Sequence, residues 1–123
     1  LPAGRTTVPR PALQPEIPAS YSVERCYDIE EERDQIVCLI SAIFQENAGA
    51  AYRVFTLCEN RQLDPGLVGA AGERGIAQIH PIHAWRFEQK GWTWDGAFDP
   101  ERNLIIAHEI FLEQSWTPWS CKP

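Results

Sequence analysis

Apolar residues recur at helical spacing in the first half of the chain. In residues 28–45 acidic side chains gather at the start, where the helix dipole favours negative charge, and isoleucine and leucine residues follow at intervals of three and four. Residues 48–58 continue the pattern, with alanine, valine, phenylalanine and cysteine on one face. Both stretches are predicted to be helices. Glu59 then falls at the end of the second helix, where a side chain can be half-buried.

Two further helices are predicted in the second half. One has Pro81 in its first turn and stops at Gly91, because proline suits the first turn of a helix and glycine its end. The other has Asp99 as its N-cap and Pro100 in its first turn. The buried stripe of this last helix is expected to comprise Leu104, Ala107, His108, Phe111 and Leu112.

The remaining segments differ from the helices in composition. Residues 64–75 are rich in glycine, which indicates tight turns and close backbone approach, with room for a short β-ribbon. Residues 1–19 contain five of the ten prolines and few periodic apolar residues, which is typical of an extended linker. We therefore predict a linker followed by one mainly α (α+β) domain over residues 20–123, in which the glycine-rich loop or ribbon lines a cleft.

The balance of charge excludes several classes of partner. The formal net charge is −6 at pH 7, and lysine and arginine are scattered, so the chain lacks the basic surface that nucleic acid or an anionic membrane requires. No apolar run approaches the roughly 20 residues that cross a bilayer. His80 and His83 have no third ligand at a recognisable spacing, so we expect no metal, and no motif indicates a cofactor. We expect a monomer.

The cysteines indicate the compartment. Cys26, Cys38, Cys58 and Cys121 are spaced too widely for a metal-binding knuckle. An even number in a short chain favours two disulfide bonds formed outside the cytosol, and four reduced, buried thiols are the alternative. The chain begins at Leu1 rather than methionine, as removal of a signal peptide or excision from a longer protein would leave it. We therefore expect a secreted or extracellular protein.

Glu59 is the candidate for chemistry. Cleavage of a glycosidic bond needs a carboxylic acid that stays protonated near neutral pH, and burial against apolar neighbours achieves this by disfavouring the charged form. Glu59 follows Val54, Phe55, Leu57 and Cys58 and so has such neighbours. A lone glutamate at a helix end is more often a solvated surface residue, so the hypothesis needs support from the rest of the chain.

Several motifs supply that support through their order along the chain. They are Cys58-Glu59-Asn60-Arg61, Asp64-Pro65, Gly75-Ile76-Ala77-Gln78-Ile79-His80-Pro81, Asp99-Pro100 with Asn103, and Trp116-Thr117-Pro118-Trp119-Ser120. Over about residues 36–121 this order resembles the soluble lytic transglycosylase and goose-type lysozyme superfamily, in particular its actinobacterial and phage-type members. In that family a glutamate after an apolar helix precedes a Gly-Leu-Met-Gln-Ile-x-Pro block, from which Ile76 and Ala77 depart conservatively.

The resemblance implies a lysozyme-like fold and an enzyme that cleaves peptidoglycan, the bacterial cell-wall glycan, between N-acetylmuramic acid and N-acetylglucosamine. It makes Glu59 the catalytic acid and places Gln78, with the backbone around Gly75 and Ile76, along the sugar-binding cleft. Glycine at Gly72 and Gly75 would let the backbone approach a saccharide, so a bulkier residue is expected to weaken binding first. An equally good interpretation of Gln78 is a buried amide that ties the loop to a neighbouring helix.

Other side chains extend the predicted site. His80 and His83 are expected to hydrogen-bond sugar or wall peptide. Trp92 and Trp94 are candidates for the cleft or its rim, where an aromatic ring can stack on a sugar face. Trp116 and Trp119 are expected instead to pack the terminal segment against the core.

The missing partner carboxylate favours one mechanism. Glycosidases ordinarily pair their acid with a second carboxylate. Goose-type lysozymes have an aspartate where this chain has His80, and another where we align Gly69. Attack by the substrate's own 6-hydroxyl, which gives a 1,6-anhydro product, requires only Glu59 as acid and then as base. The resemblance therefore favours a lytic transglycosylase.

Two alternatives remain open. Glu73, in the glycine-rich loop, could complete the two-carboxylate site of a hydrolytic lysozyme, although a surface ion pair with Arg74 or Arg53 is the simpler interpretation of that residue. The other alternative is a catalytically inactive module that binds murein.

The same assignment suggests how the cysteines pair. Cys58 lies beside the proposed acid and Cys121 in the terminal segment, so a bridge between them would pin the chain end against the helix that precedes Glu59. Cys26 then pairs with Cys38. Closing a loop of about 60 residues contributes roughly 4 kcal/mol on the chain-entropy model. Cys58 is not expected to act as a thiol nucleophile, because no histidine stands near it in a recognisable catalytic signature.

Overall fold

The computed structural model describes residues 22–123, and over that range the chain is mainly helical. The α-helices are α1 (Val23–Cys26), α2 (Glu32–Phe44), α3 (Ala48–Val54), α4 (Ala84–Gln89) and α5 (Pro100–Gln114). Short 3₁₀ turns are η1 (Gln45–Asn47), η3 (Pro81–His83) and η4 (Trp94–Phe98), and η2 (Phe55–Glu59) is a π-helical turn. The predicted linker, residues 1–19, lies outside the described residues.

The first long helix starts later than the acidic pattern suggests. The side chain of Glu31 caps it by accepting a hydrogen bond of 2.7 Å from the backbone N–H of Asp34. Before this cap the short helix α1 lies against α2, and a disulfide between Cys26 and Cys38 joins them with a Cα–Cα distance of 5.6 Å. Sequence periodicity did not predict α1, because four residues are too few to show a helical repeat.

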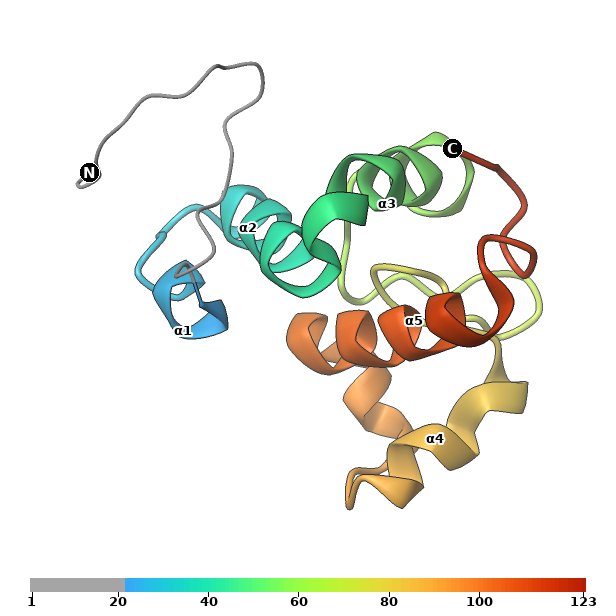
Figure 1. The fold of residues 1–123 in the computed structure, drawn as a ribbon. Coiled ribbons are helices and arrows are strands. Elements are labelled where there is room, and N and C mark those ends of the chain that lie inside the picture. Colours follow the sequence, from blue (N-terminus) through green and yellow to red (C-terminus); the bar gives the residue numbers. More distant parts are fainter. Residues whose placement is uncertain (1–21) are drawn as a thin grey trace.

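Helix α5 occupies the centre of the fold. In Figure 1, α2 and α3 lie on one side of α5, and α4 lies on the other. Large apolar side chains fill the space between α2, α3 and α5, among them Phe44, Phe55, Leu39, Leu104 and Ile110. The apolar stripes predicted for these helices therefore converge on one core.

The N-terminus of α5 agrees with the prediction, but part of its buried stripe does not. The carboxylate of Asp99 accepts a hydrogen bond of 3.0 Å from the N–H of Arg102, as expected for an N-cap. Leu112, however, is 69% exposed. It lies two residues beyond the buried Ile110, which on a helix of 3.6 residues per turn is nearly the opposite face. The prediction that Leu112 is buried was wrong for this reason.

The glycine-rich segment forms almost no regular sheet. Within the described residues its β-structure consists of isolated antiparallel bridges, one between Val68 and Arg74 and one between Arg74 and Ile79. The predicted ribbon is thus reduced to single contacts. Individual backbone hydrogen bonds, such as those from the N–H of Gly69 to Glu73 and from the N–H of Gly75 to Leu67, hold the loop together with side-chain contacts.

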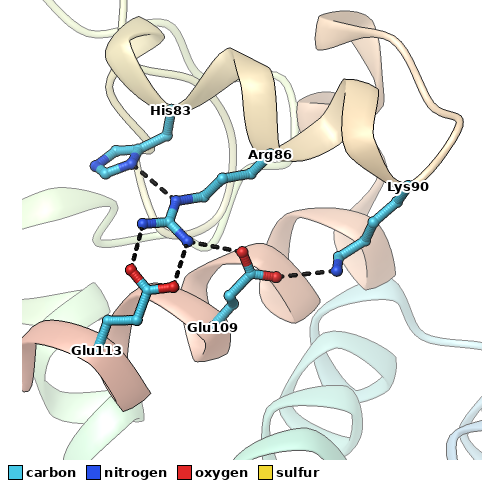
Figure 2. Close-up of polar contacts among 5 residues, drawn as sticks. All are labelled: His83, Arg86, Lys90, Glu109 and Glu113. Carbon is cyan, nitrogen blue, oxygen red and sulfur yellow. Dashed lines mark hydrogen bonds and ion pairs between the residues drawn. The ribbon is translucent and has the colours of Figure 1, made fainter.

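Arg86 anchors α4 to α5. Its side chain is 3% exposed and donates to Glu113 through both Nη atoms, at 2.7 and 3.0 Å, and to Glu109 through Nη1 at 2.7 Å. Its Nε donates to Nδ1 of His83 at 3.1 Å, and Lys90 pairs with Glu109 at 2.9 Å. Figure 2 shows the two glutamates of α5 reaching up to this arginine. A nearly buried guanidinium needs such partners, because an unpaired charge in the interior is costly.

No helix within residues 22–123 is long and apolar enough to span a membrane.

Replacing Arg86 should loosen α4. Arg86→Ala removes the partner of two carboxylates, and we expect the free energy of unfolding to fall by about 2 kcal/mol. The matched control is Arg53→Ala, a change at an exposed position of α3, which should shift it by no more than about 0.5 kcal/mol. Urea denaturation of both variants measures the difference. Equal effects would show that the Arg86 network contributes nothing specific.

Acidification through the histidine range should destabilise the protein. Burial and the nearby Arg86 lower the pKa of His83 from its ordinary value of 6.5, and burial lowers the pKa of His108 in the same direction. Between the lowered pKa and 6.5 the unfolded chain binds more protons than the folded chain, so the free energy of unfolding falls as the pH falls. The pKa values of Glu109 and Glu113 are lowered from 4.5, so the stability that these carboxylates contribute is present above 4.5 and is lost only at lower pH.

The melting temperature should therefore drop between about pH 7 and about pH 5. In the double variant His83→Gln, His108→Gln the drop should be smaller, because neither position can then take up a proton. An identical drop in the double variant would assign the effect to other groups.

Candidate functional site around Glu59

Glu59 is the last residue of the π-helical turn η2. The turn closes through a hydrogen bond of 2.7 Å from the N–H of Asn60 to the carbonyl of Phe55, one residue further back than in an α-helix. The helix predicted over residues 48–58 therefore changes form after Val54. Turns of this kind are frequent at functional sites. The Glu59 side chain is half-buried.

Asn60 fixes the end of this turn against the glycine-rich loop. Its side chain is buried, with 2% exposure. Its Nδ2 donates to the carbonyl of Asp64 at 2.8 Å and to the carbonyl of Gly75 at 3.0 Å, while its Oδ1 accepts from the N–H of Asp64 at 2.9 Å. The residue after Glu59 thus bonds to the start of the loop and to a point fifteen residues away.

Gln78 bonds to the same carbonyl from within the loop. Its Nε2 donates to the carbonyl oxygens of Leu67 and Gly75, at 3.1 Å each. Its backbone has a positive φ of 52°, which is unusual for a residue with a side chain. Gln78 therefore cross-links the loop. The carbonyl of Gly75 accepts hydrogen bonds from both Gln78 and Asn60. Its half-buried side chain is also partly open to solvent.

Gly75 and Ile76 are packed in the interior of the loop. Ile76 is fully buried, and Gly75 is buried with a positive φ of 79°. A Cβ at Gly75 would overlap the carbonyl of Ala97 and the amide of Asn103. The two residues hold the loop against η4 and α5. We therefore correct the expectation that a bulkier residue at Gly75 would weaken binding first, because it would disturb this packing.

Asn103, in α5, forms hydrogen bonds with the glycine-rich loop and with η4. Its side chain is fully buried, and its Nδ2 donates to the carbonyls of Arg74 and Ala97, both at 2.9 Å. Its Oδ1 accepts from the N–H of Ala77 at 2.9 Å. The asparagine of the Asp-Pro-x-x-Asn motif thus bonds to backbone groups of both the glycine-rich loop and η4.

The C-terminal segment, residues 116–121, covers one side of Glu59. The indole N–H of Trp119 donates to the carbonyl of Ala77 at 3.0 Å, and the N–H of Ser120 donates to Oε2 of Glu59 at 2.7 Å. Cys121 forms a disulfide with Cys58, with a Cα–Cα distance of 5.7 Å. Figure 1 shows the chain end beside the end of α3.

The packing and the pairing of this segment agree with the sequence expectations. Trp119 is 5% exposed, and Trp116 packs on Phe111 with ring centroids 4.3 Å apart. The two disulfides are the expected pairs, Cys58 with Cys121 and Cys26 with Cys38. Such bonds are typical of proteins from oxidising compartments.

Glu73 lies in the loop beside Gln78. Its Oε1 accepts a hydrogen bond of 3.0 Å from the N–H of Ala71. A Cβ added to Gly69 would overlap both this oxygen and Oε1 of Gln78, so the two side chains approach the same point. Arg74 pairs with Asp95 at 3.1 Å, so an ion pair of that arginine with Glu73 is not the arrangement found.

Three other side chains predicted to bind substrate, His80, Trp92 and Trp94, make contacts with η3 and α4. His80 is exposed, and its Nδ1 accepts a hydrogen bond of 3.0 Å from the N–H of Ile82, so it caps η3. Trp92 and Trp94 are half-buried and pack against Phe87, with ring centroids 6.3 and 5.4 Å away.

Both rings also stack with cations. The guanidinium of Arg102 lies 4.9 Å from the ring centroid of Trp92, and that of Arg74 lies 4.7 Å from the ring centroid of Trp94. Arg74 also donates to the carbonyl of Trp94, which ties this tryptophan to the glycine-rich loop.

Within the described part of the chain, no group of three or more histidine, cysteine, aspartate or glutamate residues is placed to hold a metal ion. A scan against protein-family models found no match, and neither a search of curated proteins nor a search of solved structures found one. Any assignment of function therefore depends on the residues and their geometry.

Gly75→Ala should destabilise the fold more than a matched change elsewhere. Gly91 has a similar positive φ of 82°, but a Cβ there would meet nothing within 4 Å. Gly91→Ala thus incurs only the backbone cost of about 1–2 kcal/mol. Gly75→Ala adds the overlap with Ala97 and Asn103, and we expect it to cost at least about 2 kcal/mol more. Thermal denaturation measures both, and equal losses would contradict the packing role of Gly75.

Proposed function

We propose that this protein is a secreted enzyme of lysozyme-like fold that cleaves bacterial cell-wall glycan as a lytic transglycosylase. The bond cleaved is the β-1,4 bond between N-acetylmuramic acid and N-acetylglucosamine, and the acid is Glu59. One observation carries the proposal. The carboxyl group of Glu59 sits at the end of a π-helical turn with Oε2 bonded to the N–H of Ser120, and Cys58, directly before it, forms a disulfide with Cys121, directly after Ser120.

The motifs that suggest the family lie far apart in the sequence but close together in the fold. Asn60, which follows the proposed acid, and Gln78, from the glycine-rich block, donate to the same carbonyl of Gly75. Trp119 and Ser120, from the last motif, bond to Ala77 and Glu59. A reaction that needs one acid beside a sugar-binding loop is the simplest explanation for the contacts among these residues.

The proposed reaction requires one carboxyl group that acts twice. Protonated Glu59 gives its proton to the bridging oxygen as the bond from C1 of N-acetylmuramic acid breaks, which releases the N-acetylglucosamine end. The carboxylate then takes the proton of the 6-hydroxyl as O6 forms a bond to C1. The product is a 1,6-anhydro sugar, and Glu59 is protonated again. The scheme uses no metal and no cofactor.

The partner of the protein in this proposal is the glycan itself. The net charge of −6 gives no attraction to anionic wall polymers, so short-range contacts must hold the substrate. The two disulfides favour action outside the cytosol. We propose that the enzyme acts as a monomer.

A hydrolytic lysozyme is the second candidate, because Glu73 lies in the loop beside Gln78. Its carboxylate would activate a water molecule while Glu59 protonates the bridging oxygen. The two mechanisms differ in the new end of the glycan, which is reducing after hydrolysis and anhydro after transglycosylation. A murein-binding module without activity would release neither product.

Glu59→Gln should abolish the reaction with little change in shape. The amide is nearly isosteric but has no acidic proton, so we expect turnover to fall by about 100-fold or more. Glu88→Gln, at an exposed position of α4, is the matched control. Mass spectrometry of the fragments released from purified murein measures both rate and product. Unchanged turnover in Glu59→Gln would remove Glu59 from the mechanism, and reducing ends that disappear in Glu73→Gln would favour the hydrolytic alternative.

A further inference from the structure

We infer that the backbone N–H of Ser120 positions Glu59 by determining which carboxyl oxygen carries the transferable proton. The inference rests on the proposed function. It adds a positioning group that is a backbone N–H and therefore cannot be recognised from the type of side chain. The N–H of Ser120 lies 2.7 Å from Oε2 of Glu59, at the short end of the range for N–H···O hydrogen bonds.

The direction of this bond has a chemical consequence. A backbone N–H can only donate, so Oε2 must accept in every protonation state that keeps the bond. In the neutral acid the carbonyl oxygen is a better acceptor than the hydroxyl oxygen, so this bond favours the arrangement with the proton on the other oxygen, Oε1. In the carboxylate the same Oε1 is free to accept a proton. One oxygen is committed to positioning, and the other is left for chemistry.

The donor is held in place on both sides. Trp119, one residue earlier, is nearly buried and bonds through its indole N–H to the carbonyl of Ala77. Cys121, one residue later, is bound to Cys58, which directly precedes Glu59 in the chain. The donor and the acceptor are thus flanked by a disulfide that joins their two segments. These two contacts restrict movement of the N–H relative to Glu59.

The fixed donor would serve both steps of the reaction. The proton leaves Oε1 for the bridging oxygen when the glycosidic bond breaks, and the proton of the 6-hydroxyl arrives at Oε1 when O6 attacks C1. If the carboxyl group could rotate, either oxygen could carry the proton, and a part of the molecules would present the wrong one. Loss of orientation at a reacting group lowers the rate of the chemical step more than it weakens substrate binding.

The test compares two substitutions at one position. Ser120→Pro removes the backbone donor, whereas the matched variant Ser120→Ala keeps it. We expect kcat of Ser120→Pro on soluble murein oligosaccharides to be at least about tenfold below that of Ser120→Ala, with KM alike in the two. Mass analysis after alkylation, with and without reduction, checks that the bridge between Cys58 and Cys121 is intact. Equal kcat values with the bridge intact would overturn the inference.

A second measurement does not depend on the proline variant being folded. In the wild-type protein the amide proton of Ser120 should resonate downfield, as expected for a hydrogen bond to a carboxylate, and in Glu59→Ala it should move upfield. A Ser120 resonance that stays in place would overturn the inference. Failure of the proposed function is a separate result, in which the wild-type protein releases no anhydro product from murein although the Ser120 resonance responds to Glu59.

Discussion

The carbonyl oxygen of Gly75 accepts hydrogen bonds from two amide side chains, and the geometry near Glu59 depends on this shared acceptor. Asn60 reaches it from the end of the π-helical turn, and Gln78 reaches it from within the loop. A segment with only isolated β-bridges cannot pair its own backbone groups in a ladder, yet buried groups must be paired. Side-chain amides, which donate and accept at once, supplement the backbone hydrogen bonds within the loop, such as those from the N–H of Gly69 to Glu73 and from the N–H of Gly75 to Leu67.

Helix α5 gives this loop a rigid support. Asn103 near its first turn bonds to the loop and to η4, and Glu109 and Glu113 further along hold Arg86 of α4. One helix thus carries the contacts that position the loop on one side and α4 on the other. Because these contacts are hydrogen bonds of definite direction, they determine orientation as well as proximity.

The sequence predicts the features that have a period or a local rule. The long helices follow from apolar spacing, and the cap of α5 follows from Asp99 next to a proline. Other features depend on tertiary contacts. The position of Arg86 depends on carboxylates 23 and 27 residues away, and the π-helical form of η2 depends on where Asn60 is held. The N–H of Ser120 has no signature at all, because every residue except proline has one.

The π-helical turn also bears on how such a site could change in evolution. One extra residue in a helical turn rotates everything that follows by about 100° around the helix axis. A chain that lost Thr56, between Phe55 and Glu59, would keep every side chain discussed above and could return to a regular α-helix. Its carboxylate would nevertheless face another direction. In this fold the insertion or deletion of one residue is a more drastic change than the substitution of several.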